Sequence, residues 1–314
     1  MFWSNYRRWH GARFVNTRTN APCRNPGHLG DGTFGILGVE CCTSFIPTAC
    51  PVPVPGGSTP MARYAFISDI HSNVQALESV LTEIGRAGVD GIICLGDVVG
   101  YGARPVECIE LVREHCDLTI IGNHDEFMIE NDMDPLLNDT ARESLMWTMD
   151  KLGEAHLDYI RSLSGMVYLS RDLMCVHDNP VPSMTGYIRN PRAASNAFLG
   201  VDRSICMVGH THVPQLFHTA TSSTDAAAIP LDVQSHYLED GYTISLNPEF
   251  RYIINPGAVG QPRDADPRAS WGILDLTLGH FQVNRAEYDV AGSRQDVLDA
   301  GLPGVLADRL VLGT

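Results

Sequence analysis

The sequence lacks long apolar segments and has little positive charge. No stretch of about 18 uninterrupted apolar residues occurs in its 314 residues, which argues against a membrane-spanning helix. Acidic residues outnumber basic ones by 37 to 22, for a formal net charge of -15. An acidic surface repels phosphate backbones, which argues against broad nucleic-acid binding. A phosphate-bearing substrate would therefore need a local positive centre, such as a metal.

Residues 1–60 differ in composition from the remainder of the chain. They hold five Arg, no Lys and two acidic residues, with seven of the 19 Pro and four of the nine Cys. Residues 61–314 hold 17 basic and 35 acidic residues, a net charge of -18. We expect 1–60 to be a disordered extension, or to result from an incorrectly assigned start upstream of Met61, with residues 51–60 as a Pro/Gly linker. We expect one domain over 61–314.

The cysteines and the N-terminal arginines bear on location. Arg7, Arg8 and Arg13 are not followed by an apolar stretch of about 7–15 residues, so no secretory signal is expected. The four N-terminal cysteines lack paired C-x2-C spacing, so a structural zinc is not expected. The other five lie mostly in apolar contexts, as expected for buried free thiols in a reducing cytoplasm.

The chain from Met61 onward begins as alternating strands and helices. Apolar runs predict strands at 64–67, 92–95 and 118–121. Apolar residues at helical spacing predict a helix from Val74 to about Gly85, and a second helix is expected over 105–115 with Pro105 in its first turn. This βαβαβ order predicts a sheet with parallel strands and flanking helices, an α/β fold.

The second half is richer in strands. Helices are expected over about 138–149, 154–162 and 292–300, and residues 219–240 are expected to form a loop. Strands are predicted at 166–169, 173–176, 205–208, 215–218, 242–246, 252–254, 271–276 and 281–286. This pattern predicts a second sheet packed on the first.

Five of the predicted strands end at residues that can bind metals. These residues are Asp69 and His71, Asp97, Asn123 and His124, His177, and His210 and His212. The carboxyl ends of strands in an open α/β sheet gather at one edge, so we expect these side chains to converge. Imidazole, carboxylate and amide oxygen without thiolate suit Mn, Fe or Zn. The set is too large for one tetrahedral ion and large enough for two.

The same residues carry a family resemblance. Asp69-x-His71, Gly96-Asp97, Gly122-Asn123-His124-Asp125, His177 and Gly209-His210-x-His212 resemble the five blocks of the calcineurin-like metallophosphoesterase superfamily, in order. The stretches 254–263 and 301–313 resemble segments of its small prokaryotic phosphodiesterase-type branch.

The resemblance implies a four-layer αββα sandwich, with two mixed β-sheets flanked by helices, and a site with two divalent ions (Mn, Fe, Zn or Ni). It implies a first ion held by Asp69, His71, Asp97 and His212. It implies a second ion held by Asp97, Asn123, His177 and His210, with Asp97 bridging. His124 would be the proton donor or a stabiliser of the phosphoryl group, and Asp125 would orient it.

The activity implied is metal-dependent hydrolysis of a phosphate ester by a metal-bridging hydroxide, with a small nucleotide-type diester as the favoured substrate. The alternatives are a phosphomonoesterase (a protein Ser/Thr phosphatase or a dinucleoside tetraphosphatase) and a non-catalytic binding scaffold. Asn73, Tyr101 and Arg263 are candidate substrate contacts. The chain departs from the family pattern at Asp178, where relatives often carry a small residue, and this bears on the choice of metal or substrate.

Overall fold

The computed structural model describes residues 63–130, 138–181, 184, 186–221 and 231–314. The expected extension over 1–60 and a part of the predicted loop 219–240 lie outside these residues.

The first sheet contains six strands in the described part of the chain, in the order β3-β2-β1-β11-β12-β9. The strands are β1 (Arg63–Ile67), β2 (Gly91–Cys94), β3 (Leu118–Thr119), β9 (Thr243–Ser245), β11 (Ala269–Asp275) and β12 (His280–Ala286). β1, β2 and β3 are parallel, whereas β11 joins β1 in antiparallel register. The parallel part therefore places the ends of β1 and β2 side by side.

The second sheet also has six described strands, in the order β4-β5-β6-β10-β7-β8. They are β4 (Met166–Tyr168), β5 (Leu173–Val176), β6 (Ile205–Met207), β7 (Pro214–Ala220), β8 (Gln234–Tyr237) and β10 (Phe250–Pro256). β5, β6 and β10 are parallel, and the other pairings are antiparallel. Both sheets are thus mixed, as predicted.

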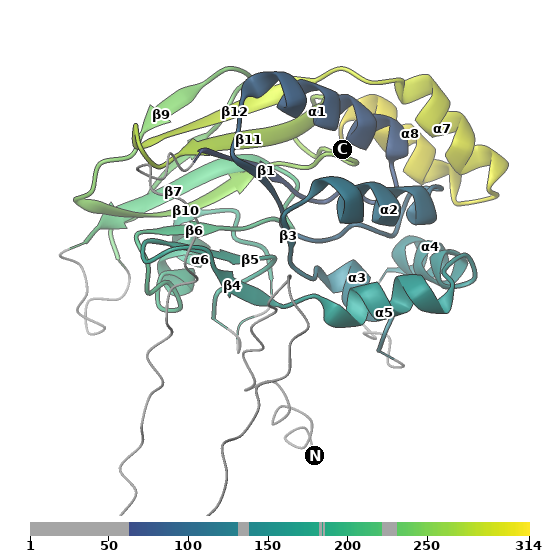
Figure 1. The fold of residues 1–314 in the computed structure, drawn as a ribbon, viewed down its shortest axis with the longest axis horizontal. Helices are drawn as coiled ribbons and strands as arrows, with labels where there is room; N and C mark the ends of the chain where they lie inside the picture. Colours follow the sequence, from purple (N-terminus) through teal and green to yellow (C-terminus); the bar gives the residue numbers. More distant parts are fainter. Residues whose placement is uncertain (1–62, 131–137, 182–183, 185, 222–230) are drawn as a thin grey trace, which may run out of the picture. The chain divides into compact units, whose positions relative to one another are not determined.

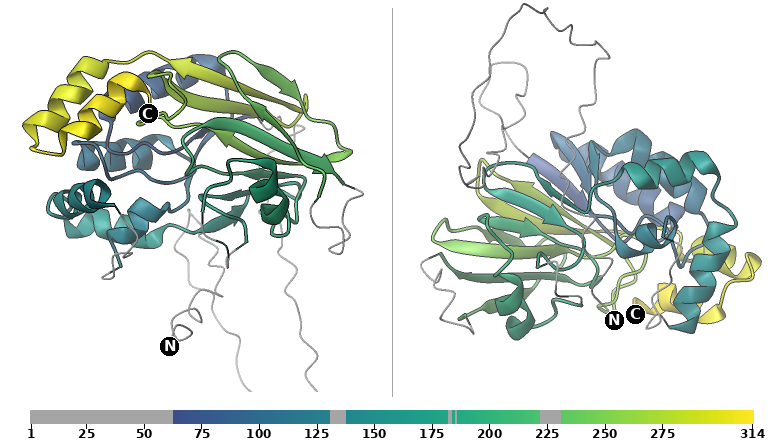
Figure 2. Two further views of the ribbon diagram at one scale, coloured as in Figure 1. Left: turned by 180° about the vertical axis from the view of Figure 1, so that it is seen from behind. Right: turned by 90° about the horizontal axis from the view of Figure 1, so that it is seen from below.

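Helices cover the outer faces of the two sheets (Figures 1 and 2). They are α1 (Val74–Ala87), α2 (Pro105–His115), α3 (Asn123–Phe127), α4 (Asp139–Met149), α5 (Glu154–Ser162), α6 (Pro191–Ala197), α7 (Val290–Asp299) and α8 (Gly304–Leu312). Apolar side chains of α1 and α2 pack on the first sheet, and those of α6 pack on the second. A separate core between the sheets includes Phe66, Leu95, Met207 and Phe281. The predicted α/β class with four layers is confirmed, and no described helix is both long and apolar enough to cross a bilayer.

The structure differs from the sequence-based elements at five elements. β8 lies inside the predicted loop 219–240, and all four of its residues are exposed. α3, α6 and α8 were not predicted, and β3 ends at Thr119, although Ile120 continues as an isolated bridge to Ser164. α3 and α6, with five and seven residues, have too few turns for a clear apolar period, which explains why these two helices were not predicted.

The core between the sheets yields a stability prediction. Phe281 is fully buried, and its ring packs over Gly272 on the neighbouring strand. Phe281→Ala should lower the free energy of unfolding by about 3–5 kcal/mol, because it removes a buried aromatic ring and leaves a cavity. Urea unfolding measures the loss, and Leu278→Ala, at a side chain that is 66% exposed, is the matched control. Equal midpoints for the two variants would contradict this account of the core.

Candidate metal centre

The predicted metal-binding residues converge from both sheets. Asp69 and His71 follow β1, Asp97 follows β2, Asn123 and His124 begin α3, His177 follows β5, and His210 and His212 follow β6. Three overlapping groups have ligand atoms within 4.8 Å of one another: Asp69, His71 and His212; His71, Asp97 and His124; and Asp97, His177 and His210. The predicted convergence at the strand ends is therefore present.

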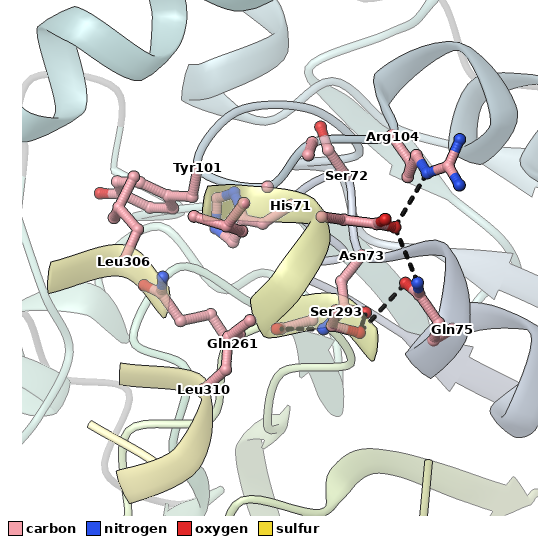
Figure 3. Close-up of a pocket in the computed structure, with 15 residues that line it drawn as sticks. His71, Ser72, Asn73, Gln75, Tyr101, Arg104, Gln261, Ser293, Leu306 and Leu310 are labelled. Atoms are coloured by element: carbon pink, nitrogen blue, oxygen red, sulfur yellow. Dashed lines mark hydrogen bonds and ion pairs between the residues drawn. The ribbon is translucent and has the colours of Figure 1, made fainter. Parts of the chain in front are cut away.

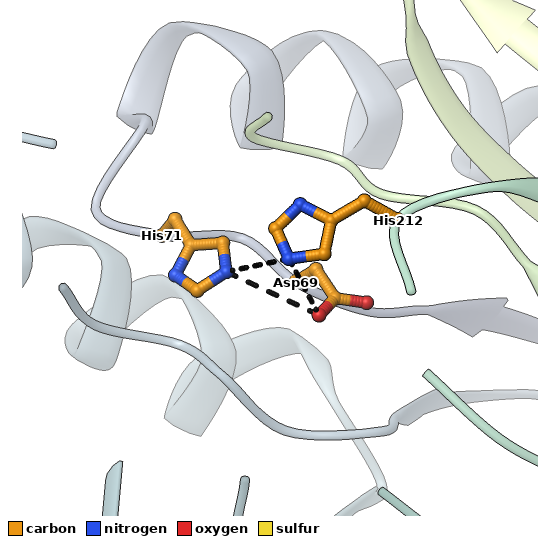
Figure 4. Close-up of side chains that lie close together, drawn as sticks. All are labelled: Asp69, His71 and His212. Carbon is orange, nitrogen blue, oxygen red and sulfur yellow. Dashed lines mark hydrogen bonds and ion pairs between the residues drawn. The ribbon is translucent and has the colours of Figure 1, made fainter. Parts of the chain in front are cut away.

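The first group joins β1 to the loop after β6 (Figure 4). The Nε2 atoms of His71 and His212 lie 3.2 Å apart. Oδ1 of Asp69 lies 3.3 Å from Nε2 of His212 and 4.0 Å from Nε2 of His71. All three side chains are buried, so water does not screen these groups from one another.

Backbone carbonyls fix the tautomer of three of the histidines. Nδ1 lies 3.0 Å from the Val99 oxygen in His71, 2.7 Å from the Leu95 oxygen in His177 and 2.6 Å from the Gln261 oxygen in His212. A carbonyl only accepts, so each Nδ1 carries the proton and, in a neutral ring, Nε2 presents a lone pair.

This arrangement fits a divalent cation. Burial lowers the pKa values of His71 and His212 well below their usual range, so both rings are neutral. Two neutral nitrogens that face each other with lone pairs at 3.2 Å repel, whereas a cation beside them would attract both. The donor set of carboxylate and imidazole suits a transition-metal ion.

The other two groups share Asp97. Oδ2 of Asp97 lies 3.2 Å from Nε2 of His177 and 3.6 Å from Nε2 of His71. The side-chain oxygen of Asn123 is buried and accepts no hydrogen bond within the described structure. A buried side-chain oxygen without a hydrogen-bond partner fits the role of a metal ligand. Asp97 therefore lies within ion-pair distance of histidines that follow strands of both sheets.

The loops that carry these ligands hold an unusual backbone conformation. The φ angles are positive at Asp69, His71, Asp97, His210 and His212, between 47° and 67°. Non-glycine residues in this region cost about 1–3 kcal/mol each and persist where the surroundings determine the conformation. A Cβ at residue 122 would collide with the Asp97 carboxylate and backbone, so glycine is required there.

The titrating groups of the centre have displaced pKa values. Burial raises the pKa of Asp69 to about 6. Burial alone would lower the pKa of His177, but the carboxylates of Asp97 and Asp69 raise it to about 10. Burial also works against ionisation of Asp97, yet His177 and His124 hold its pKa well below the usual range. In the absence of a metal, the His177 proton therefore compensates the Asp97 charge.

His124 lies at the edge of the centre against Tyr101. Its backbone N–H donates to Oδ1 of Asp97 at 2.8 Å, and its ring centroid lies 4.5 Å from that of Tyr101 and 4.8 Å from that of His71. Nδ1 has no hydrogen-bond partner in the described structure. Burial lowers the pKa of His124 to about 4, so the ring is neutral.

Asp125 binds backbone N–H groups, and no hydrogen bond joins its carboxylate to the His124 ring in the described part of the chain. Its Oδ1 accepts from the backbone N–H groups of Val98 and Val99, at 2.9 and 3.1 Å, and its Oδ2 accepts from that of Gly122, at 3.0 Å. Asp125 therefore ties the loop after β2 to the start of α3. It positions Asp97 and His124 through the backbone, because its carboxylate has no direct contact with the imidazole.

Asn73 has a structural role at the start of α1. Its Oδ1 accepts from the Ala76 N–H at the start of α1 and from the Ser293 hydroxyl, and its Nδ2 donates to the Gly260 oxygen. Figure 3 shows this network in a small pocket beside His71, lined also by side chains of α7 and α8. The Asn73 amide therefore links the start of α1 to α7 and to the segment that carries Gly260.

Tyr101 and Arg263 lie together beside the metal-binding groups. The Arg263 guanidinium lies 5.6 Å from the Tyr101 ring centroid, and Arg263 donates to the Gln261 side chain at 3.0 Å. No carboxylate among the described residues forms an ion pair with Arg263. Its charge therefore remains available near the centre, as expected for a phosphate contact.

The loop after β5 adds two residues at His210. Oδ1 of Asp178 lies 3.8 Å from Nε2 of His210, and the Tyr187 ring stacks on the His210 ring with centroids 4.4 Å apart. Tyr187 was not predicted, because a tyrosine in an irregular loop gives no pattern that would connect it with a histidine elsewhere in the chain.

Comparisons with known proteins agree with this geometry. The model of the calcineurin-like phosphoesterase superfamily domain matches residues 63–279. An uncharacterized protein of Methanocaldococcus jannaschii is 33% identical over 253 residues, which are 79% of this chain and 97% of that protein.

Two solved structures extend the comparison. A metallophosphoesterase from Sphaerobacter thermophilus shares 41% identity with a TM-score of 0.70, covering 81% of this chain and 100% of that one. A hypothetical protein from Pyrococcus horikoshii OT3 shares 19% identity with a TM-score of 0.63, covering 81% of this chain and 99% of that one, and shows the fold alone.

The fold and the clustered histidines and aspartates define a metal-binding hydrolase of phosphoric esters. The chain belongs to the calcineurin-like phosphoesterase superfamily, and the predicted resemblance is confirmed.

The position of Asp125 yields a second prediction. Asp125→Asn places an amide N–H₂ opposite a backbone N–H, so at least one buried amide loses its acceptor. We expect a loss of about 1–3 kcal/mol in the free energy of unfolding and weaker Mn²⁺ binding, measured by urea unfolding and by calorimetric titration. Glu130→Gln, at an exposed carboxylate nearby, is the control. Unchanged stability and metal binding with a large loss of turnover would instead indicate a direct action of Asp125 on His124.

Proposed function

We propose that this protein hydrolyses phosphate esters with two divalent ions, and that its substrates are small nucleotide-type diesters. The first ion would be held by Asp69, His71, Asp97 and His212, and the second by Asp97, Asn123, His177 and His210. The observation that carries the proposal is the position of Asp97. Its carboxylate lies within ion-pair distance of one histidine from each set, 3.6 Å from His71 and 3.2 Å from His177.

The ions, when bound, would activate a water molecule as the nucleophile and neutralise the phosphate charge. The chain's own residues would do the remaining work. Arg263 would contact a phosphate oxygen, because its guanidinium has no carboxylate partner among the described residues and faces Tyr101 at the edge of the centre.

His124 would donate a proton to the leaving oxygen. Its ring is neutral in the free protein because burial lowers its pKa to about 4. A phosphate anion placed beside the ring would raise that pKa and favour a proton on the imidazole. Tyr101 would keep the ring in place by packing against it at a centroid distance of 4.5 Å.

We also propose that the protein works in a reducing compartment, as the cytoplasm is. The five described cysteines (Cys94, Cys108, Cys116, Cys175 and Cys206) are all free thiols. Surviving thiols favour a reducing environment over an oxidising one.

The third prediction tests the activity itself. The full chain should hydrolyse bis(p-nitrophenyl) phosphate with added Mn²⁺, and EDTA should abolish turnover until Mn²⁺ is restored. Its melting temperature should also rise with Mn²⁺, because an ion that binds only the folded state stabilises it. The assay records p-nitrophenolate release with Mn²⁺, Fe²⁺, Zn²⁺ and Ni²⁺ on diesters and monoesters. No rate above the blank with any metal and any ester would refute the proposal.

The fourth prediction concerns the proton donor. His124→Ala should lower kcat by about 100- to 10,000-fold, as expected when a general acid is lost. Bound metal, measured by mass spectrometry of the metal content, should stay at the level of the unmodified protein. His115→Ala, at an exposed position at the end of α2, is the control. Full turnover in His124→Ala would show that another group protonates the leaving oxygen.

A further inference from the structure

The loop after β5 places a carboxylate beside the candidate second ion. Asp178 directly follows His177, and its Oδ1 lies 3.8 Å from Nε2 of His210. Both histidines belong to the second proposed ligand set. The Asp178 side chain is 31% exposed, so it lies at the border between the centre and the solvent, where a substrate would arrive.

The protein does not neutralise this carboxylate with a fixed cation. No Lys or Arg of the described residues lies within ion-pair distance of Asp178. Its one hydrogen bond among them is a long one from the Gly186 N–H, at 3.5 Å. Arg189 forms no ion pair with Asp178, and its guanidinium lies 4.0 Å from the Tyr187 ring centroid. The Asp178 charge therefore acts on whatever binds next to His210.

Phosphate diesters and monoesters differ in charge. A diester carries one negative charge, whereas a monoester carries nearly two above its second pKa of about 6. The repulsion from a nearby carboxylate is proportional to that charge, and it is stronger at the border of a buried site than in bulk water. A fixed carboxylate beside the phosphate position consequently penalises a monoester about twice as much as a diester.

We propose that Asp178 is a specificity-determining residue that selects phosphodiesters over phosphomonoesters by charge repulsion. The inference rests on the proposed function and names the substrate class of the same site. In this inference Asp178 repels the substrate and is not one of the proposed metal ligands.

The test compares Asp178→Asn with the unmodified full chain at pH 8, where monoesters are fully ionised. The substrates are bis(p-nitrophenyl) phosphate and p-nitrophenyl phosphate, both with saturating Mn²⁺. We expect kcat/KM for the monoester to rise about tenfold, whereas that for the diester changes by less than about threefold. Inorganic phosphate, which is a dianion at this pH, should bind about tenfold more tightly in a calorimetric titration.

Two matched variants serve as controls. One tests the shape of the side chain at residue 178, and the other tests the net charge of the protein. Asp178→Glu keeps the charge and should keep the low monoester rate. Asp172→Asn removes an exposed carboxylate at the opposite end of β5 and should leave both rates unchanged. Metal content measured by mass spectrometry should be equal in all four proteins.

The outcomes distinguish this inference from the proposed function. An unchanged ratio of diester to monoester rates in an Asp178→Asn protein that still hydrolyses diesters would overturn the inference alone. Loss of bound metal in Asp178→Asn would also overturn it, because Asp178 would then be a metal ligand. Failure of the unmodified protein on every ester would overturn the proposed function together with the inference.

Discussion

Burial of the Asp97 carboxylate imposes the strictest constraint on this structure. A buried anion is costly unless charges or hydrogen bonds compensate it, and Asp97 is 1% exposed. The His124 N–H supplies one hydrogen bond, and His71 and His177 supply imidazoles from both sheets. Asp97 and these three partners come from four different segments of the chain. The carboxylate can therefore be accommodated only when the two sheets are correctly packed. Folding and assembly of the site are therefore one event.

The backbone conformation of the loops that carry the candidate ligands also depends on contacts between different segments of the chain. Five of the seven candidate ligands have positive φ angles, which cost about 1–3 kcal/mol each for residues other than glycine. Cross-loop hydrogen bonds hold these conformations: the Asp69 N–H donates to the Gly96 oxygen, and the His71 N–H donates to the Asp97 oxygen. Each loop is fixed by its neighbour, and none of them would keep this shape alone. The free-energy cost of the positive φ angles is thus offset by interactions with other loops, as is common at functional sites.

The sequence predicted the strand ends well, because each apolar run stops at a polar residue and parallel strands align such ends. It predicted the convergence of Asp69 and Asp97 for the same reason, because β1 and β2 are parallel neighbours. It could not predict the long-range hydrogen bonds of Asn73 to Gly260 and of Asp125 to Val98 and Val99, because these partners lie on other segments of the chain. The strand β8 could not be predicted either, since both its faces are exposed and no alternation of apolar residues marks it.

The orientation of His124 differs in origin from that of His71, His177 and His212. His71, His177 and His212 are each oriented by a backbone carbonyl at Nδ1, which suits a ligand whose nitrogen must stay unprotonated. His124 has no such partner and is held by packing against Tyr101 and by the close approach of Gly100. A ring held by packing alone can exchange a proton without breaking a hydrogen bond at Nδ1. The contact at Nδ1 thus distinguishes His71, His177 and His212, which are suited to binding a metal, from His124, which is suited to moving a proton.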